Sequence, residues 1–477
     1  MFPAPPRAGT GSSADDRVIS EKNMHKTSTL ALAVAAAMGI AGPGFAQTND
    51  ALREEVRQLK QRTDALEQRV QDAESAASRA ARAGNRPAGE NALNPAVSLI
   101  LNGVYSNLSR SPSDFRINGF VPTLGEVEPF RRGLSLGESE LALAANIDQD
   151  FRGTGIFSIT PQNEVAAEEA YIQTLALSHG FTAKAGRFFS GVGYQNQVHA
   201  HAWDFTDAPL ANKVFLGNQL ADDGVQLKWV APTDTYFDLG LELGRGRAFP
   251  AAAPEGAARD KNGVGSANAF AHLGGDFGSG FAWQAGLSYL RTSPRDRTFQ
   301  DVDSAGTAVT NSFGGRSSLW ALSGVLKWAP DFNSTEKSVK LQGEYFRRKE
   351  DGDLTFDNAA AAGGPQTGAF ASRQSGWYLQ TVYQFLPMWR VGYRYDRLSA
   401  GTQTIGLVDS GTLSAADFPV LGHYNPTRNT VMADWSASEF SRVRLQLARD
   451  RSRRDEPDNQ VFLQYIVSLG AHGAHTF

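Results

Sequence analysis

The chain has 477 residues, no cysteine, 48 glycines and a formal net charge of −4 at pH 7. The absence of cysteine excludes disulfides, a cysteine-based zinc site and lipid attachment to an N-terminal cysteine, and the acidic balance disfavours a nucleic-acid partner. No run of about 20 apolar residues follows the N-terminal region, which excludes a helical membrane protein. A mean hydropathy of −0.34 remains compatible with a transmembrane barrel, because the apolar residues of a barrel alternate with polar ones.

The N-terminal region has the layout of a secretory signal peptide. A Met-His-Lys start at residues 24–26 precedes an apolar run over 30–40 and a small-residue ending at Ala46. The apolar run is too short to span a bilayer, so we expect a signal peptide over residues 24–46 that is cleaved after Ala46. Residues 1–23 lie upstream and show no apolar pattern, so we interpret them as an extension from a mis-assigned start codon.

Residues 50–78 carry apolar side chains at alternating spacings of four and three, which is the seam of a coiled coil. The positions that flank this seam pair opposite charges, which favours parallel helices in a homo-oligomer. A single amphipathic helix lying on its own barrel is the alternative. Residues 79–95, rich in Ala, Gly, Arg and Asn, indicate a flexible linker. The expected oligomerisation contacts are Leu52, Val56, Leu59, Leu66 and Val70.

From residue 96 to residue 477, segments with a period of two recur, which predicts an all-β fold. Their number is even, as a barrel with both ends on one side of a membrane requires. We therefore expect a transmembrane antiparallel β-barrel of about 16 strands, preceded by the short α-helical coiled coil. The predicted strands lie near 96–106, 136–147, 153–160, 167–176, 181–190, 223–231, 235–244, 266–275, 280–291, 317–329, 338–348, 374–385, 388–398, 427–437, 440–450 and 459–471.

The connections between these segments alternate between short turns and long loops. Tight periplasmic turns and long outer loops are the known asymmetry of outer-membrane barrels, and a soluble β-sandwich gives no reason for it. We therefore expect the barrel in the bacterial outer membrane and the coiled coil in the periplasm. The predicted long outer loops are 107–135, 191–222, 245–265, 292–316, 349–373 and 399–426.

The last predicted strand begins at Val461, and the chain ends on Phe477. Its apolar residues alternate with polar ones, and its aromatic end resembles the closing strand of bacterial outer-membrane barrels, which seals the barrel against the first strand. This resemblance implies that Phe477 marks barrel closure and that the barrel-assembly machinery is a partner through this strand. Outer-membrane lipid and lipopolysaccharide would surround the barrel.

Sixteen strands leave an aqueous channel, so inward positions should be polar. Acidic groups come from early strands and basic groups from late strands, roughly opposite one another. We therefore predict a transverse field across the lumen, whereas the simpler interpretation is that charges only fill a wet interior. The expected pore-lining residues are Glu138, Glu140, Glu169, Asp238, Glu242, Lys327, Lys340, Arg390, Arg394, Arg428, Arg442 and Arg444.

The predicted loop 191–222 mixes aromatic residues with His199, His201, Asp204, Asp207 and Lys213. This composition favours a constriction loop folded into the lumen, with those five residues at the narrowest point. His199 and His201, with the two aspartates, also offer nitrogen and oxygen ligands for a divalent metal such as zinc. Two histidines two apart are a weak signal, and hydrogen bonding within a packed loop is the alternative role.

Several segments resemble the phosphate-selective-type porin superfamily: Leu136–Asn146, Glu168–Gln173 and Ala183–Phe189, the last followed by Gly191-Val-Gly. The resemblance covers residues 96–477 and implies a sixteen-stranded barrel, a coiled coil after the signal peptide and a homotrimer. Phosphate selectivity does not carry over, because phosphate-selective members line the pore with an arginine ladder and a lysine cluster. Here the loop offers one lysine against several acids and two histidines.

The sequence therefore predicts an outer-membrane porin for passive diffusion of small hydrophilic solutes or ions, with no cofactor. A selective channel or receptor for a divalent metal is the first alternative, and a surface adhesin that binds through its long loops is the second. We expect no enzymatic activity, because no catalytic motif with its required spacing occurs.

Overall fold

The computed structural model describes residues 95–123, 127–160, 164–252 and 262–470. The predicted extension, signal peptide, coiled coil and nearly all of the linker lie outside the described residues, as does Phe477. The oligomerisation residues Leu52, Val56, Leu59, Leu66 and Val70 also lie outside them.

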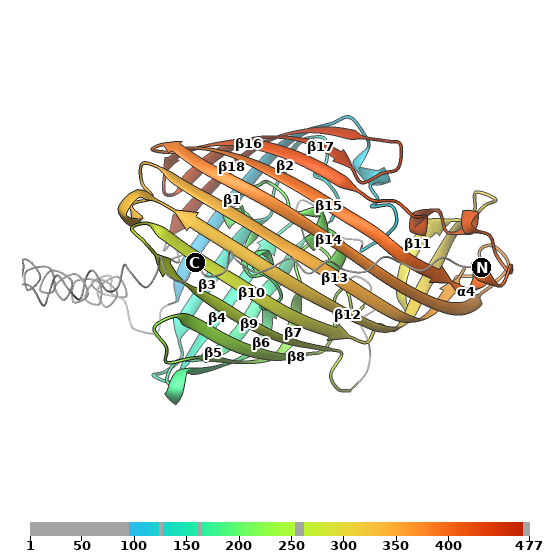
Figure 1. Cartoon of the computed structure of the whole chain (residues 1–477), viewed down its shortest axis with the longest axis horizontal. Coiled ribbons are helices and arrows are strands. Elements are labelled where there is room, and N and C mark those ends of the chain that lie inside the picture. The colour runs from blue at the N-terminus through green and yellow to red at the C-terminus, as the bar shows by residue number, and fades with distance from the viewer. Residues whose placement is uncertain (1–94, 124–126, 161–163, 253–261, 471–477) are drawn as a thin grey trace, which may run out of the picture. The chain divides into compact units, whose positions relative to one another are not determined.

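The described chain forms a closed antiparallel β-barrel (Figure 1). Closure comes from the first and last strands, in which Ser98 pairs with Gly470 and Leu108 with Gln460. Two short strands, β2 and β11, continue the strands β3 and β10 after interruptions and pair with the same neighbours. The eighteen strands therefore fill sixteen positions around the wall, which confirms the predicted fold class.

The strands are β1 (Ala96–Leu108), β2 (Gly133–Leu136), β3 (Ser139–Asn146), β4 (Phe151–Ile159), β5 (Val165–Thr174), β6 (Phe181–Phe189), β7 (Ala221–Val230), β8 (Tyr236–Gly244), β9 (Ser266–Phe277), β10 (Phe281–Thr292), β11 (Arg297–Val302), β12 (Ala308–Trp328), β13 (Ser338–Phe356), β14 (Gln366–Leu386), β15 (Trp389–Ile405), β16 (Thr427–Ser438), β17 (Ser441–Arg451) and β18 (Asp458–Gly470). Each of the sixteen predicted segments corresponds to one position in the wall.

Helices are few and short among the residues that the structure describes. They are η2 (Pro112–Asp114), η3 (Ser178–Gly180), η4 (Gln195–Gln197), η5 (Ala200–Ala202), α3 (Leu210–Leu216), η6 (Pro330–Phe332), α4 (Gly406–Asp409), η7 (Ala415–Asp417) and η8 (Pro419–Leu421). No helix in the described part of the chain is both long enough and apolar enough to cross a bilayer.

The outer surface of the barrel carries an apolar belt. Outward residues such as Leu227, Leu379 and Leu463 are exposed large hydrophobic side chains, while their strand neighbours point inward. This alternation follows from the period of two in a strand. Trp320 packs against Tyr289 with ring centroids 4.6 Å apart and ring planes tilted by 43°, which adds aromatic surface of the kind found at membrane interfaces.

The wall is taller on one side, because β12 to β15 are 17 to 21 residues long (Figure 1). The segments 292–316 and 349–373, expected to be loops, are largely strand, so that prediction is wrong. Their Gly, Ser, Asp and Thr residues weaken the apolar pattern, but the cross-strand pairing continues. On β13 the outward face changes from Leu341 and Tyr345 to charged side chains from Arg347 onward.

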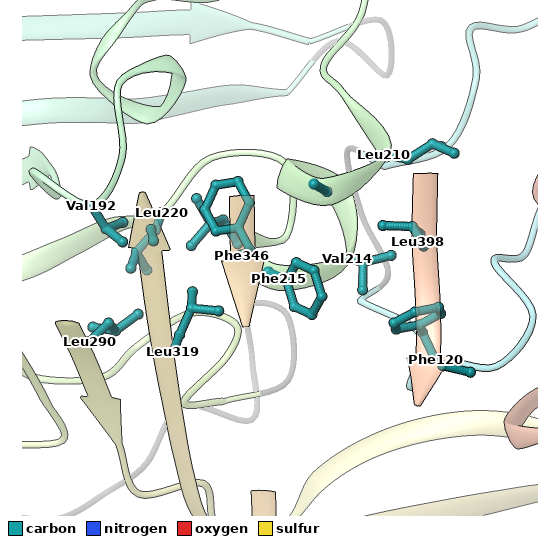
Figure 2. Packing of buried hydrophobic residues seen from close by; sticks show 14 residues of the cluster. Phe120, Val192, Leu210, Val214, Phe215, Leu220, Leu290, Leu319, Phe346 and Leu398 are labelled. Atoms are coloured by element: carbon teal, nitrogen blue, oxygen red, sulfur yellow. The ribbon is translucent and has the colours of Figure 1, made fainter. Parts of the chain in front are cut away.

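Part of the interior is packed with hydrophobic side chains. Figure 2 shows Phe215 of α3 pointing toward Phe346 of β13 and Phe120 of the loop after β1. The ring centroids of Phe215 and Phe346 are 5.9 Å apart. We call this cluster the inner plug; it consists of Phe120, Val192, Leu210, Ala211, Val214, Phe215, Leu216, Leu220, Leu290, Leu319, Ala321, Phe346, Leu398 and Ala400.

A second buried hydrophobic cluster lies farther out, among the extended strands. It includes Phe313 and Phe370, whose rings meet edge to face at 5.5 Å, and Phe418 from the loop after β15. The expectation that sixteen strands leave an aqueous channel rather than a packed interior is therefore wrong for the part of the interior that these two clusters fill. The reason is that the long loops supply enough apolar surface to form a core with inward Leu and Phe side chains.

Candidate functional site

The loop 191–222, which connects β6 to β7, folds into the lumen and is held there by inward carboxylates. Glu242 accepts hydrogen bonds from the backbone N–H of Gly191 at 2.8 Å and from Ser190 Oγ at 2.5 Å. Glu344 accepts from the backbone N–H of Tyr194 at 2.6 Å, and Asp396 accepts from that of Leu210 at 2.9 Å. Three wall positions thus fix the path of the loop.

The aspartates of the loop face basic side chains of β13 to β17, which we call the basic wall. Asp204 lies 2.9 Å from Lys340 Nζ and 3.3 Å from Arg390 Nη1. Asp207 lies 3.3 Å from Arg394 Nη2 and also pairs with Arg428. The basic wall consists of Lys340, Arg390, Arg394, Arg428, Arg442 and Arg444.

These ion pairs determine the ionisation of the two loop carboxyls. Burial opposes ionisation of both groups. The charges of Lys340 and Arg390 nevertheless hold the pKa of Asp204 well below its usual range. The charges of Arg428 and Lys213 do the same for the pKa of Asp207. Both aspartates therefore dock the loop as anions.

The histidines of the loop face the opposite side, the acidic wall, formed by Glu140 on β3 and by Glu168 and Glu169 on β5. His201 Nδ1 lies 2.7 Å from Glu140 Oε1. His199 Nε2 lies 3.0 Å from Glu169 Oε2, and its Nδ1 lies 3.3 Å from Glu140 Oε2 and 3.4 Å from Glu168 Oε2. Burial opposes protonation of His199, but the three carboxylates raise its pKa well above the usual value.

A β-bulge explains why two consecutive glutamates both reach this cluster. On β5, Glu169 pairs with Ile156 and Ala167 pairs with Phe157, so Glu168 is an extra residue between them. In a regular strand Glu168 would face the opposite side from Glu169. A bulge re-aims one side chain, and here it brings Glu168 to the lumen.

Beside this cluster is a cavity of about 1020 Å³, bounded by β1, β3 to β10 and the loop. Charged residues of both signs line it, among them Glu140, Glu169, Asp238, Lys184 and Lys228. Its lining extends to the strand ends next to the short turns, such as Ala144 and Thr182, and to the start of β1 at Ala96. The acidic side of the lumen is thus open and polar, whereas the loop covers the basic wall.

The other residues predicted to line the pore lie at several places along the barrel wall. Glu138 lies in the interruption between β2 and β3, and Lys327 near the end of β12. Asp238 is buried and contacts His272 Nδ1 at 2.8 Å. Arg442 donates to the carbonyl oxygen of His201 at 2.5 Å, and Arg444 to that of Trp203 at 2.9 Å.

The predicted metal ligands do not come together as a set. Asp204 and Asp207 pair with the basic wall, whereas the two histidines contact the acidic wall, so the structure does not bring these four residues together. Sequence reasoning missed Glu168 because the bulge is not visible in the strand period. It also missed Glu344 and Asp396, whose roles depend on the path of the loop.

No family model matches the chain. A curated relative from Aquifex aeolicus (strain VF5), described as an uncharacterized protein, is 28% identical over 416 residues, which cover 82% of this chain and 81% of the relative.

Solved outer-membrane structures are similar at low identity. In-vitro folded OmpT of Vibrio cholerae is 10% identical with a TM-score of 0.47, covering 80% of this chain and 98% of its own. The outer membrane channel DcaP of Acinetobacter baumannii is 12% identical with a TM-score of 0.45, covering 79% and 97%. The anion-selective porin of Comamonas acidovorans is 10% identical with a TM-score of 0.45, covering 79% and 99%. At these values the likenesses assign no function to the chain.

Proposed function

We propose that the chain is an outer-membrane porin through which small hydrophilic solutes or ions diffuse passively, and that loop 191–222 is its constriction. The observation that carries this proposal is a closed barrel with an apolar belt outside and a charged lumen inside, crossed by a loop that is anchored to both walls.

The membrane location is supported by the exposed apolar surface. Side chains such as Leu241, Leu322 and Tyr465 are about half or more exposed, which is unfavourable in water and favourable in lipid. A closed barrel leaves no unpaired strand edge, so its backbone polar groups are satisfied within the bilayer. The change to Arg347 and Lys349 on β13 marks one boundary of this belt.

Passage is supported by the polar cavity beside the loop. A cavity of about 1020 Å³ with charged and histidine side chains offers a hydrated path for small solutes. The loop neutralises much of the basic wall, and the cavity lining itself mixes acids with Lys184, Lys228 and Arg152. We therefore expect the channel to discriminate weakly between anions and cations. We also expect a small conductance, because the inner plug fills the rest of the cross-section of the lumen.

The N-terminal part fits this proposal. Secretion through the signal peptide over 24–46 would deliver the barrel to the outer membrane. The coiled coil over 50–78 would then join three copies in the periplasm, with Val56 and Leu66 in its seam.

Planar-bilayer recording of the purified full chain tests the proposal. We expect discrete conductance steps and a reversal potential close to zero in a salt gradient. The absence of any conductance step from protein that inserts into the bilayer would contradict a porin.

A further inference from the structure

Three potential ligand atoms converge where loop 191–222 meets the acidic wall. They are His199 Nδ1, Glu140 Oε2 and Glu168 Oε2, and ligand atoms of these three residues all lie within 4.8 Å of one another. Glu140 is buried, and Glu168 and His199 are mostly covered. One ligand comes from β3, one from the bulge of β5 and one from the loop.

The spacing of these atoms suits a tetrahedral metal ion. His199 Nδ1 is 3.3 Å from Glu140 Oε2 and 3.4 Å from Glu168 Oε2. Ligands bound at about 2.0–2.1 Å in tetrahedral geometry lie about 3.3–3.4 Å apart. Both distances from His199 Nδ1 thus match this geometry, and the two carboxylate oxygens lie within 4.8 Å of each other, within reach of a common ion.

Among the described residues, His199 Nδ1 and Glu168 Oε2 are buried and make no hydrogen bond of regular geometry; they have only the ion-pair contacts at 3.3 and 3.4 Å. A buried polar atom without a hydrogen bond lowers the stability of the folded protein, and most buried polar atoms in proteins have a partner. A single proton on Nδ1 cannot serve both Glu140 and Glu168. A divalent cation that displaces this proton to solvent would contact Nδ1 and both carboxylates at once and offset the repulsion between the two carboxylates.

The surrounding contacts orient these ligands as in established metal sites. His199 Nε2 lies 3.0 Å from Glu169 Oε2, which fixes the imidazole and directs Nδ1 toward the two other carboxylates. Glu169 is itself held by the backbone N–H of Phe189 at 3.0 Å. His201 Nδ1 contacts Glu140 Oε1 at 2.7 Å and leaves Oε2 for the ion. A histidine whose second nitrogen bonds a carboxylate is the usual supporting arrangement.

We propose that Glu140, Glu168 and His199 bind a divalent first-row transition metal, with zinc as the best match. One imidazole and two carboxylate oxygens favour zinc and its neighbours over calcium or magnesium, which prefer oxygen ligands alone. Glu140 and His199 line the cavity, so water or a solute can complete the coordination shell from that side. The bound ion would join the loop to β3 and β5. This site does not depend on the passage of solutes.

Zinc titration of the full chain, without a polyhistidine tag and after chelator treatment, tests the site by calorimetry in detergent. We expect one tightly bound zinc ion per chain. Glu168→Gln should weaken zinc binding more than about 100-fold, because this substitution removes a ligand, whereas loss of a residue that only orients a ligand costs less. Glu169→Gln should weaken binding by about 10–100-fold. X-ray absorption of the zinc-loaded protein should show one imidazole among oxygen ligands.

His272→Gln is the matched control, because it removes a histidine–carboxylate pair of the same cavity, with Asp238, that lies outside the proposed ligand set. Zinc binding should be unchanged in this variant. Retained barrel structure, seen as the usual heat-dependent shift in gel mobility, separates loss of a ligand from misfolding. His199→Asn provides a second ligand variant with the same expected loss. Tight binding that persists in Glu168→Gln and His199→Asn, or its absence from the wild type, would overturn the site, whether or not the chain conducts.

Discussion

Asp207 of loop 191–222 and Arg428 of β16 form an ion pair inside the barrel, although 221 residues separate them in the sequence. On the other side of the same loop, His199 contacts Glu169 of β5. The loop therefore bridges two walls of opposite charge: its aspartates pair with the basic wall, and its histidines contact the acidic wall. This bridging determines which part of the lumen stays open.

The first prediction concerns the anchor at Asp207. Asp207→Asn removes a buried partner of Arg428 and Arg394 and should lower the free energy of unfolding by about 3–5 kcal/mol, because it leaves buried charge uncompensated. Thermal unfolding monitored by circular dichroism measures the loss. Asp351→Asn is the control: its pair with Lys349 is more than half exposed and should contribute little. Equal effects of the two variants would contradict the anchoring role.

A second prediction follows from the ionisation of Asp204. Lys340 and Arg390 hold its pKa below the usual carboxyl range, so its folded pKa lies below its unfolded pKa. The stabilisation is therefore fully present above about pH 3.8 and is lost only as pH falls through the lower folded pKa. The difference in stability between wild type and Asp204→Asn should stay constant from pH 7 to pH 5. A difference that shrinks steadily over this interval would show that Asp204 titrates there.

The inner plug gives a third prediction. Phe215 is fully buried against Phe120 and Phe346, so Phe215→Ala should cost about 3–5 kcal/mol and loosen α3. Urea unfolding and limited proteolysis within loop 191–222 would report the two effects. Phe332→Ala makes the same chemical change at an exposed position in η6 and should alter neither. A plug that tolerates Phe215→Ala without loss would not be a packed core.

A fourth prediction tests the expected coiled coil. The double substitution Val56→Asp and Leu66→Asp adds charge to the predicted seam and should convert a trimer to monomers without unfolding the barrel. Light scattering of the detergent-purified protein gives the subunit number. Gln58→Asp with Ala65→Asp adds the same charges outside the seam and should leave the assembly intact. Monomers in the wild type would contradict the predicted oligomer.

The strands could be predicted because the alternation of apolar and polar residues is visible within each short segment of the sequence. Outward Leu227 and Trp229 alternate with inward Gln226 and Lys228 on β7, and the period of two alone assigns both faces. The same reasoning failed for the outer parts of β12 to β15. There Gly314 and Gly315 pair with Asp353 and Gly352, and their pairing depends on neighbouring strands rather than on an apolar pattern.

The site could be predicted only in part. The loop composition singled out His199 and His201, and the segregation of acids and bases along the chain anticipated two kinds of wall. The bulge at Glu168 and the pairing of Asp207 with Arg428 could not be predicted, because both depend on register and on contacts between distant segments. For the same reason the packing of Phe215 into the lumen was missed.

The central claim is that loop 191–222, anchored at Asp204 and Asp207, limits passage through the barrel. Single-channel conductance of the Asp204→Asn and Asp207→Asn double variant, recorded beside wild type in the same planar bilayers, tests it most directly. We predict small, steady steps from wild type and larger, noisier steps from the double variant. Identical steps from the two proteins would contradict the claim.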